Sequence, residues 1–584
     1  MDNDGSTNDD DKGQSLHELS LHHGASIVSQ LVDIGSRHNQ QPHEKFLPII
    51  RRLQCLSPRG TKLFRGQINA FDKQEYIALS YTWKSSEHED PKSGKYQVEG
   101  WDSQGLKSSA VRDCVFDRIL SYMRYAQVQL LWIDAHCIRQ DECDGDTCAH
   151  HSRCTEKRDA LQAMDLVYQL SSHPVALLGR PMQETSELHL LKLIMTGKLV
   201  AKSDNGSESP FWKPTELGEA IRALRLLHDI TQDLWWRRAW TFQENYRGGR
   251  PMRLLIPYTS SLESPKRCLK GICPMTPTVV TDIEERGLSN PWDRLAILAN
   301  CCQYSTRLDV EALIQQNRSL SLSVLAMCLL NGEILDNSDD SQTSTVPLTV
   351  SHFLRRQLFK AFSAPEDYTR PLTFNKSCRL IDVELMTDGI STMGHIWKLS
   401  RVIDTSKFER ELPPIRNPRG ESILDERKCL QQLVHYLKKQ RHRFLADQTD
   451  KYLADDAHKA GSKTYATFTE MSEAEAWQHL GFGGGYSPYS AVFVWSDEDE
   501  GVQWPPPAFV FTSAWSRVQG SEAHEPNDID RHVSLEVDLE QPRLSTGVPH
   551  LRVRTWRLGM CFFKDCPCIE VVFPWPRALR DIKP

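Results

Sequence analysis

Between residues 75 and 260, short apolar runs alternate with stretches that place apolar side chains three or four positions apart. Continuous apolar runs are typical of strands buried on both faces, and the wider spacing predicts amphipathic helices. Strands are expected at 76–81, 128–133, 173–178 and 252–256, and helices at 109–126, 156–171 and 216–246. This β-α-β-α alternation predicts an α/β domain over 75–256, with a mostly parallel sheet flanked by helices and right-handed crossovers.

The segments on either side of this domain have weaker patterns. Residues 1–14 form an acidic tail that is expected to be disordered, and 15–74 are interpreted as a helical and extended lead-in with a helix over 15–35. We expect a helical and α+β C-terminal region. It divides into a mainly helical part over 257–490, with helices at 350–362, 392–403 and 425–446, and a β-rich part over 491–584. Within the α/β domain, 141–155 and 181–215 are predicted insertions.

The composition excludes several classes of protein. Of the 584 residues, 39% are hydrophobic, and the formal net charge of -7 provides no global field that would attract nucleic acid or an anionic membrane. No window approaches the roughly 18 consecutive apolar residues of a membrane span, and the acidic N-terminus does not resemble a signal peptide. The 16 cysteines show no disulfide framework. We therefore expect reduced thiols in an intracellular, cytoplasmic protein.

In three motifs, an apolar run is followed at its end by polar side chains. They read Tyr-Ile-Ala-Leu-Ser-Tyr-Thr-Trp (76–83), Leu-Trp-Ile-Asp-Ala-His-Cys-Ile-Arg-Gln (131–140) and Trp-Trp-Arg-Arg-Ala-Trp-Thr-Phe-Gln-Glu (235–244). Ser80, Tyr81 and Trp83 end the first strand, and Asp134 follows the second. Parallel sheets bind ligands just beyond the carboxyl ends of their strands. The alternative is that the first three side chains pack at the strand end and that Asp134 caps a helix or a turn.

The third motif combines three kinds of side chain on one helix. Trp240 and Glu244 are four positions apart and share a helix face, and Arg237 lies one turn before Trp240. Such a set suits a sugar–phosphate ligand: the arginine takes a phosphate, the indole stacks on a ring, and the carboxylate binds ribose hydroxyls or stabilises a positive sugar carbon. The alternative is an amphipathic helix with buried tryptophans and an Arg–Glu pair on its surface.

Taken together and in this order, the motifs resemble the heterokaryon incompatibility (HET) domain of fungal proteins. The positions that match its pattern are Tyr76, Ala78, Leu79, Ser80, Tyr81, Trp83, Trp132, Ile133, Asp134, Ala135, Cys137, Ile138, Gln140, Met164, Tyr168, Arg238, Trp240, Gln243 and Glu244. Three positions depart from it, since Lys84 replaces the usual glycine, His136 a leucine and Arg139 an asparagine. The segment 290–294, Asn-Pro-Trp-Asp-Arg, is similar to one that often follows such domains.

HET domains are similar in fold to Toll/interleukin-receptor (TIR) domains, which are flavodoxin-like, and the resemblance therefore implies a TIR-like fold. Some TIR domains hydrolyse NAD at a helix that carries Trp-Cys-x-x-Glu, and Trp240 and Glu244 have the same spacing. By this resemblance, NAD is the substrate and Glu244 is the catalytic carboxylate. The side chains expected to bind the substrate are Ser80, Tyr81, Trp83, Asp134, Arg238 and Trp240.

The family role implied is non-self recognition in fungi, which ends in growth arrest or programmed cell death. Two mechanisms remain open at the level of the sequence. One is an enzyme that consumes NAD. The other is a non-catalytic signalling module that associates with itself or with another protein, in which Trp240 and Glu244 are structural. Neither mechanism calls for nucleic acid or for a membrane span.

The insertion after Gln140 is rich in cysteine and histidine. Cys143, Cys148 and Cys154, with His150 or His151, would supply the four ligands of a tetrahedral zinc site. Their spacings are not those of a common zinc finger. A structural zinc ion, held by Cys143, Cys148, His150 and Cys154, is one interpretation, and a polar loop with incidental thiols is the other.

Overall fold

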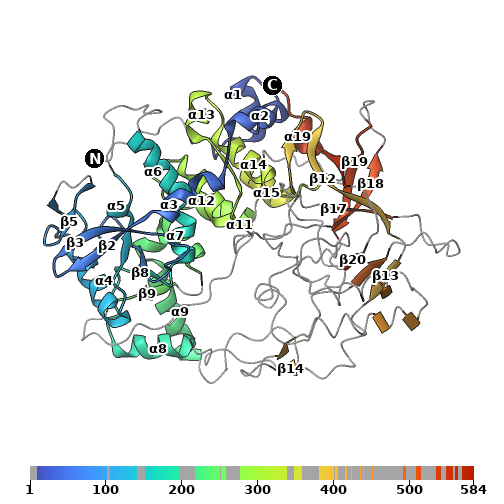
Figure 1. Cartoon of the computed structure of the whole chain (residues 1–584). Coiled ribbons are helices and arrows are strands. Elements are labelled where there is room, and N and C mark those ends of the chain that lie inside the picture. Colours follow the sequence, from blue (N-terminus) through green and yellow to red (C-terminus); the bar gives the residue numbers. More distant parts are fainter. Residues whose placement is uncertain are drawn as a thin grey trace. The chain divides into compact units, whose positions relative to one another are not determined.

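The computed structural model describes residues 10–101, 105–140, 152–195, 217–249, 252–257, 276–337, 348–357, 380–399 and 568–584, with shorter stretches between 401 and 562. The chain divides into two compact units (Figure 1). Residues 40–315 form the first, here called the site unit because it contains all three motifs. Residues 1–39 and 316–584 form the second, here called the flanking unit.

The site unit is built on an eight-stranded sheet with the order β6-β5-β3-β2-β7-β4-β8-β9. Its strands are β2 (Leu53–Arg59), β3 (Lys62–Ile68), β4 (Ile77–Ser80), β5 (Gln97–Glu99), β6 (Leu106–Ser108), β7 (Leu131–Ile133), β8 (His173–Leu177) and β9 (Arg253–Leu255). The strands β7, β4, β8 and β9 are parallel to their neighbours in this half of the sheet. The four strands predicted between 76 and 256 are these four.

The sheet is mixed, and the expected mostly parallel character is not confirmed. The lead-in contributes a hairpin, β2–β3, and β2 pairs antiparallel with β7. The hairpin turns at Gly60, whose φ of +63° is a conformation that glycine adopts without strain. Leu53, Cys55 and Leu63 bury the hairpin against the core. The predicted lead-in is therefore part of the sheet that carries the motifs.

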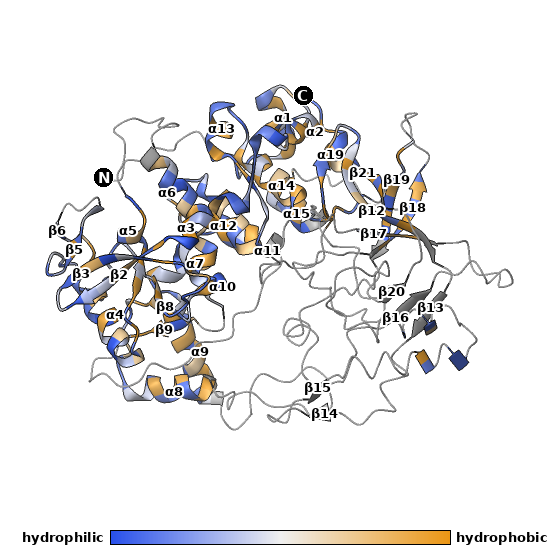
Figure 2. Ribbon diagram, in the orientation of Figure 1, coloured by the Kyte–Doolittle hydropathy of each residue, from blue (hydrophilic) through white to orange (hydrophobic). Residues whose placement is uncertain are grey.

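Helices flank this sheet, and their spacing of apolar residues explains where they form. In α4 (Asp113–Ala126), the buried side chains Val115, Ile119 and Met123 lie four positions apart. Two of the predicted helices are interrupted. Residues 152–170 form α6 (Ser152–Gln162) and α7 (Met164–Leu170), and residues 217–248 form α9 (Leu217–Thr231), the 3-10 turn η5 (Leu234–Arg237) and α10 (Ala239–Gly248). Hydrophobic and hydrophilic residues alternate along α8 (Thr185–Met195), as in an amphipathic helix (Figure 2).

The site unit also contains several shorter helices and strands outside the main sheet. They are β1 (Gln40–Pro42), η2 (His43–Phe46), α3 (Leu47–Arg51), α5 (Asp134–Cys137), α11 (Thr276–Glu284), α12 (Asp293–Cys302), β10 (Thr306–Leu308) and α13 (Val310–Gln315). Strand β1 pairs antiparallel with β10, outside the main sheet.

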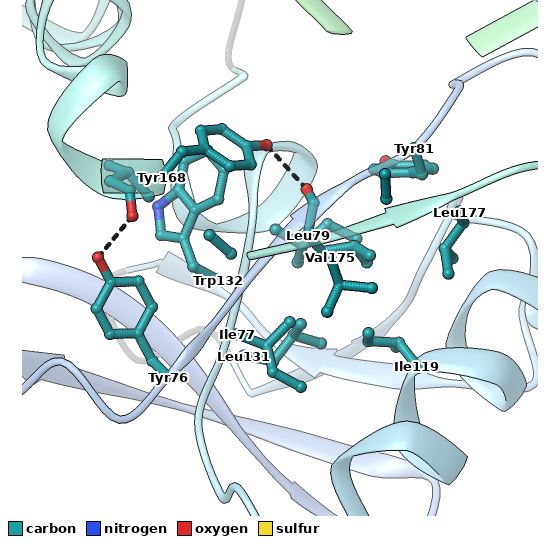
Figure 3. Close-up of a cluster of buried hydrophobic side chains, with 14 of the residues drawn as sticks. Tyr76, Ile77, Leu79, Tyr81, Ile119, Leu131, Trp132, Tyr168, Val175 and Leu177 are labelled. Carbon is teal, nitrogen blue, oxygen red and sulfur yellow. Dashed lines mark hydrogen bonds between the residues drawn. The ribbon is translucent and has the colours of Figure 1, made fainter. Parts of the chain in front are cut away.

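Aromatic side chains fix α7 against the sheet. The Tyr168 hydroxyl donates to the carbonyl of Leu79 at 3.0 Å, and the Tyr76 hydroxyl donates to the carbonyl of Val167 at 2.7 Å (Figure 3). The rings of Tyr168 and Trp132 meet edge to face, with centroids 5.7 Å apart. These contacts tie α7 to β4 at the strand that carries the first motif.

The flanking unit combines helices with a second sheet. Its helices are α1 (Leu16–His23), α2 (Ile27–Ile34), η1 (Arg37–Asn39), α14 (Leu320–Leu330), α15 (Val350–Gln357) and α19 (Arg577–Arg580). The sheet has the order β11-β12-β17-β18-β19-β21, with β12 also pairing β21. Its strands are β11 (Glu384–Leu385), β12 (Gly389–Leu399), β17 (Ala508–Ser513), β18 (Ser534–Glu540), β19 (His550–Trp556) and β21 (Cys568–Pro574). Short strands β13 (Arg401–Asp404), β16 (Ala491–Val494) and β20 (Met560–Phe562) form one small sheet, and β14 (Ile415–Arg416) and β15 (Ser422–Ile423) another.

Two sequence-based expectations fail in the flanking unit. Residues 392–403, predicted to be helical, lie in strands β12 and β13, because β12 finds its partners more than 100 residues further along the chain. The predicted disorder of 1–14 does not extend to Asp11, which is buried and accepts hydrogen bonds from the backbone N–H and the hydroxyl of Ser321 at the start of α14. Within the described part of the chain, none of the helices has the length and apolarity that a membrane span requires.

Candidate functional site

The first two motifs end at one edge of the sheet. Ser80 is the last residue of β4, and Asp134 directly follows β7. These strands are parallel neighbours, and their register sets Leu79 opposite Ile133. Ser80 and Asp134 therefore leave the sheet side by side at its carboxyl edge, which is where parallel sheets bind ligands.

A buried chain of hydrogen bonds joins the third motif to Ser80. The Trp235 indole N–H donates to the Ser80 hydroxyl at 2.7 Å, and this hydroxyl in turn donates to the Glu244 carboxylate. Glu244 is only 5% exposed, and Ser80 and Trp235 are more deeply buried. Because the indole occupies a lone pair of the Ser80 oxygen, the hydroxyl hydrogen is directed at Glu244.

Asp233 fastens the start of the third motif. One oxygen of its carboxylate accepts the backbone N–H of Trp235 at 2.9 Å. The other accepts the N–H groups of Gly179 and Arg180, both at 2.8 Å, in the turn after β8. Asp233 thus caps the 3-10 turn that holds Trp235 and ties it to a neighbouring strand end.

The loop after β4 is fixed by a second carboxylate and a buried ion pair. The Trp83 indole N–H donates to Asp134 at 2.8 Å, and the Ala135 N–H donates to the same carboxylate at 2.7 Å. Arg112 donates to the Trp83 carbonyl at 2.7 Å and pairs with the buried Glu89 at 3.2 Å. Trp83 itself remains 49% exposed. A large aromatic surface is therefore held open to solvent beside Asp134.

The electrostatics of the site centre on Glu244. Burial, followed by the negative charge of Asp134, raises the pKa of Glu244 to about 8, against the hydrogen bond from Ser80 and the nearby guanidinium of Arg238. Burial also raises the pKa of Asp134, against the hydrogen bonds from Trp83 and Ala135. A cationic group placed beside these carboxyls would favour their ionised forms. The site is thus suited to a positively charged ligand.

The basic residues of the third motif differ in their surroundings. Arg238 precedes α10, and its half-buried side chain has no hydrogen bond or ion pair within the part of the chain that the structure describes. Its charge nevertheless opposes the rise in the pKa values of Asp134 and Glu244. Arg237 is exposed and donates to Gln232 at 2.9 Å. Arg238 is therefore the better placed of the two for an anionic group.

Residues 76–244 match the family model described as heterokaryon incompatibility protein (HET). The chain carries a HET domain. Its matched segment begins at Tyr76 in the first motif and ends at Glu244, the last residue of the third. No curated protein and no solved structure matches the chain.

Most of the predicted site residues lie close together in the HET domain, whereas Tyr81 and Trp240 have other surroundings. Ser80, Glu244 and Asp134 share one edge of the sheet, and Trp83 covers Asp134. Tyr81 is buried, and desolvation raises the pKa of its hydroxyl well above the ordinary value. Trp240 is half-buried and donates its indole N–H to Asp293 at 3.1 Å.

Three residues that hold the site in place were not assigned to it from the sequence. Trp235 and Asp233 stand in or beside the third motif, where an aspartate before two tryptophans is a recognisable helix-start signal. Asp293 lies in the segment 290–294, beyond the matched HET segment. Nothing in its spacing from the motifs connects it to Trp240, since the contact depends on how α12 packs against α10.

Most of the predicted zinc ligands lie outside the residues that the structure describes. Cys143, Cys148 and His150 lie outside the described residues, and Cys154 is half-buried on α6. Within the described ranges, no group of three side chains has the arrangement needed to hold a metal ion. Zinc binding by the insertion remains a prediction.

Proposed function

We propose that the HET domain hydrolyses the N-glycosidic bond of NAD, with Glu244 as its catalytic carboxylate, and that this activity serves fungal non-self recognition that ends in cell death. The observation that supports the proposal best is the chain from Trp235 through Ser80 to Glu244, which holds a buried carboxyl at the carboxyl edge of the sheet beside Asp134. Desolvated carboxyl groups with displaced pKa values are typical of catalytic sites.

The order of the parallel strands supports a TIR-like origin for this site. The four strands β4, β7, β8 and β9 run parallel to one another. Numbered one to four in chain order, they stand in the sheet in the order two, one, three, four. A flavodoxin-like sheet begins in the same order. The spacing from Trp240 to Glu244 is also that of NAD-cleaving TIR domains.

The reaction needs little from the protein except electrostatics and positioning. As the bond between the ribose carbon and the nicotinamide nitrogen breaks, nicotinamide leaves with the bonding electron pair as a neutral molecule, so no acid is required. The ribose carbon becomes positive, and an ionised Glu244 stabilises it until water adds and releases a proton. The pyridinium charge of bound NAD favours ionisation of Glu244 before the bond breaks.

The other residues have roles that match their positions. The Arg238 side chain has no hydrogen bond or ion pair within the described part of the chain, and it suits the pyrophosphate. Trp83 offers an exposed indole on which a ring can stack. Asp134 stands next to Ser80 and suits the ribose hydroxyls.

A non-catalytic signalling module is the second candidate. The exposed apolar side chains Ile221 and Leu224 lie three positions apart on α9, and are 43% and 50% exposed. Residues at this spacing share a helix face, which suits self-association. In this case the buried pair of Ser80 and Glu244 would be structural.

One comparison separates the two candidates. Purified full-length chain is assayed for loss of NAD and release of nicotinamide, beside Glu244→Gln and the double variant Ile221→Lys/Leu224→Lys, with Arg225→Ser as an exposed control on α9. The enzyme proposal predicts turnover that Glu244→Gln abolishes. If the wild type leaves NAD intact, and the α9 double variant alone removes both self-association and cell killing, the signalling module is the function.

A further inference from the structure

Asp293 makes a contact that extends the candidate site beyond the matched HET segment. It is the first residue of α12, and its carboxylate accepts the indole N–H of Trp240 at 3.1 Å. The turn before it is itself ordered, because Asn290 accepts the backbone N–H of Trp292 through its side chain at 3.1 Å and the N–H of Asp293 through its carbonyl at 3.2 Å. The acceptor is therefore presented to Trp240 by a fixed turn.

The contact repeats an arrangement found elsewhere in the site. Trp83 is exposed and Trp240 is half-buried, and each donates its indole N–H to a carboxylate, Asp134 for the first and Asp293 for the second. An indole has one donor, so an acceptor at a fixed place selects one of the ring orientations that the side chain would otherwise sample. Trp240 lies one helical turn from Glu244, on the same face of α10.

The charge around Asp293 matches this role. Burial raises the pKa of Asp293 to about 6, against the hydrogen bond from Trp240 and the charge of Lys157 on α6. The Trp240 indole donates to this carboxyl, and the charge of Lys157 acts on it electrostatically. Within the described residues Asp293 forms no ion pair, and its side-chain hydrogen bond is to the indole.

We propose that Asp293 is a positioning residue that holds the ring of Trp240 in the plane on which a planar heteroaromatic ring of the nucleotide substrate stacks. This inference rests on the proposed function, because it names a second stacking surface for the same ligand. It places a determinant of substrate affinity in α12, outside the segment that defines the HET domain.

The test compares two substitutions of Asp293 in the full-length chain. Asp293→Asn keeps an oxygen that can accept the indole N–H, whereas Asp293→Ala removes the acceptor. We expect Asp293→Ala to raise KM for NAD about tenfold with a smaller change in kcat, since a tenfold change corresponds to about 1.4 kcal/mol, the scale of one hydrogen bond. Asp293→Asn is expected to raise KM less than threefold.

A double-mutant cycle with Trp240→Phe shows whether Asp293 acts through the indole. Phenylalanine keeps a ring but has no N–H, so Asp293→Ala should add little to the KM of Trp240→Phe. Effects of Asp293→Ala and Trp240→Phe that multiply, or equal losses in Asp293→Ala and Asp293→Asn, would overturn the proposal. Thermal unfolding of every variant shows whether a loss reflects unfolding.

Fluorescence separates this inference from the proposed reaction. The difference in emission between wild type and Trp240→Phe reports on Trp240, and we expect NAD to quench it in the wild type and in Asp293→Asn far more than in Asp293→Ala. Quenching without turnover would contradict NAD hydrolysis and leave stacking on Trp240 intact. Absence of quenching in the wild type would overturn the stacking role whether or not NAD is consumed.

Discussion

Replacing Glu244 with glutamine should stabilise the protein at neutral pH while removing its proposed activity. The pKa of Glu244 rises from 4.5 to about 8 in the folded chain, first because of burial and then because of Asp134. Between these values the unfolded chain has released the proton and the folded chain still holds it. Folding is therefore opposed more strongly as the pH rises, and the stability contributed by the protonated group is lost on approaching pH 8.

The magnitude follows from the two pKa values. At pH 7 the pH is about 2.5 units above the pKa of the carboxyl in the unfolded chain. At roughly 1.4 kcal/mol per unit, keeping Glu244 protonated in the folded chain lowers the free energy of unfolding by about 3 kcal/mol. Glutamine has no proton to lose, and its oxygen still accepts the hydrogen bond from Ser80. The advantage of Glu244→Gln over the wild type should be small near pH 4.5 and should grow by roughly 2–3 kcal/mol between pH 5 and pH 7.

The assay is thermal unfolding of both proteins from pH 5 to pH 8, in which this difference corresponds to several degrees in Tm. Glu44→Gln is the matched control, because it removes an exposed carboxyl by the same substitution. A Glu244→Gln variant that is less stable than the wild type at pH 7, or that loses stability with pH in parallel with it, would refute the reasoning. Such a result would mean that the folded protein holds Glu244 ionised.

Three further predictions concern the same site. The value of kcat/KM for NAD should increase as the pH rises toward 8, because the proposed step needs Glu244 ionised and the pKa of Glu244 is about 8. A flat pH profile would argue against this role. Trp235→Phe should lower NAD turnover and cost about 1 kcal/mol in the free energy of unfolding, since it removes the hydrogen bond that directs Ser80; unchanged turnover in a folded variant would contradict it. Arg112→Met should cost about 3 kcal/mol, measured by denaturant unfolding. The buried Glu89 then keeps the N–H of Ser86 at 3.1 Å and, as its cation, Arg118 at 3.7 Å. A loss below ~1 kcal/mol would show that the ion pair is not important for stability.

Local sequence patterns predict the parts of this fold whose structure depends on local contacts. The strands β4, β7, β8 and β9 lie within or next to the predicted apolar runs, because burial on both faces leaves a continuous hydrophobic signal. Ser80 and Asp134 could be placed at one edge of the sheet for the same reason. The carboxyl ends of neighbouring parallel strands coincide wherever such strands pair.

Features that depend on partners far along the chain could not be predicted in this way. Residues 392–403 have apolar spacing that fits a helix, but strand β12 is stabilised by β17 and β21, whose residues lie beyond 500. The hairpin β2–β3 joins the sheet through β7, which lies more than 60 residues away. The contact between Trp240 and Asp293 likewise requires the packing of α12 on α10.

The most direct test of the proposed function is the consumption of NAD by the full-length chain near pH 8, measured as release of nicotinamide, with Glu244→Gln beside the wild type. We predict steady release by the wild type and none by the variant, with thermal unfolding showing that both are folded. Equal release by the two proteins, or no release by a folded wild type at high protein concentration, would contradict catalysis by Glu244.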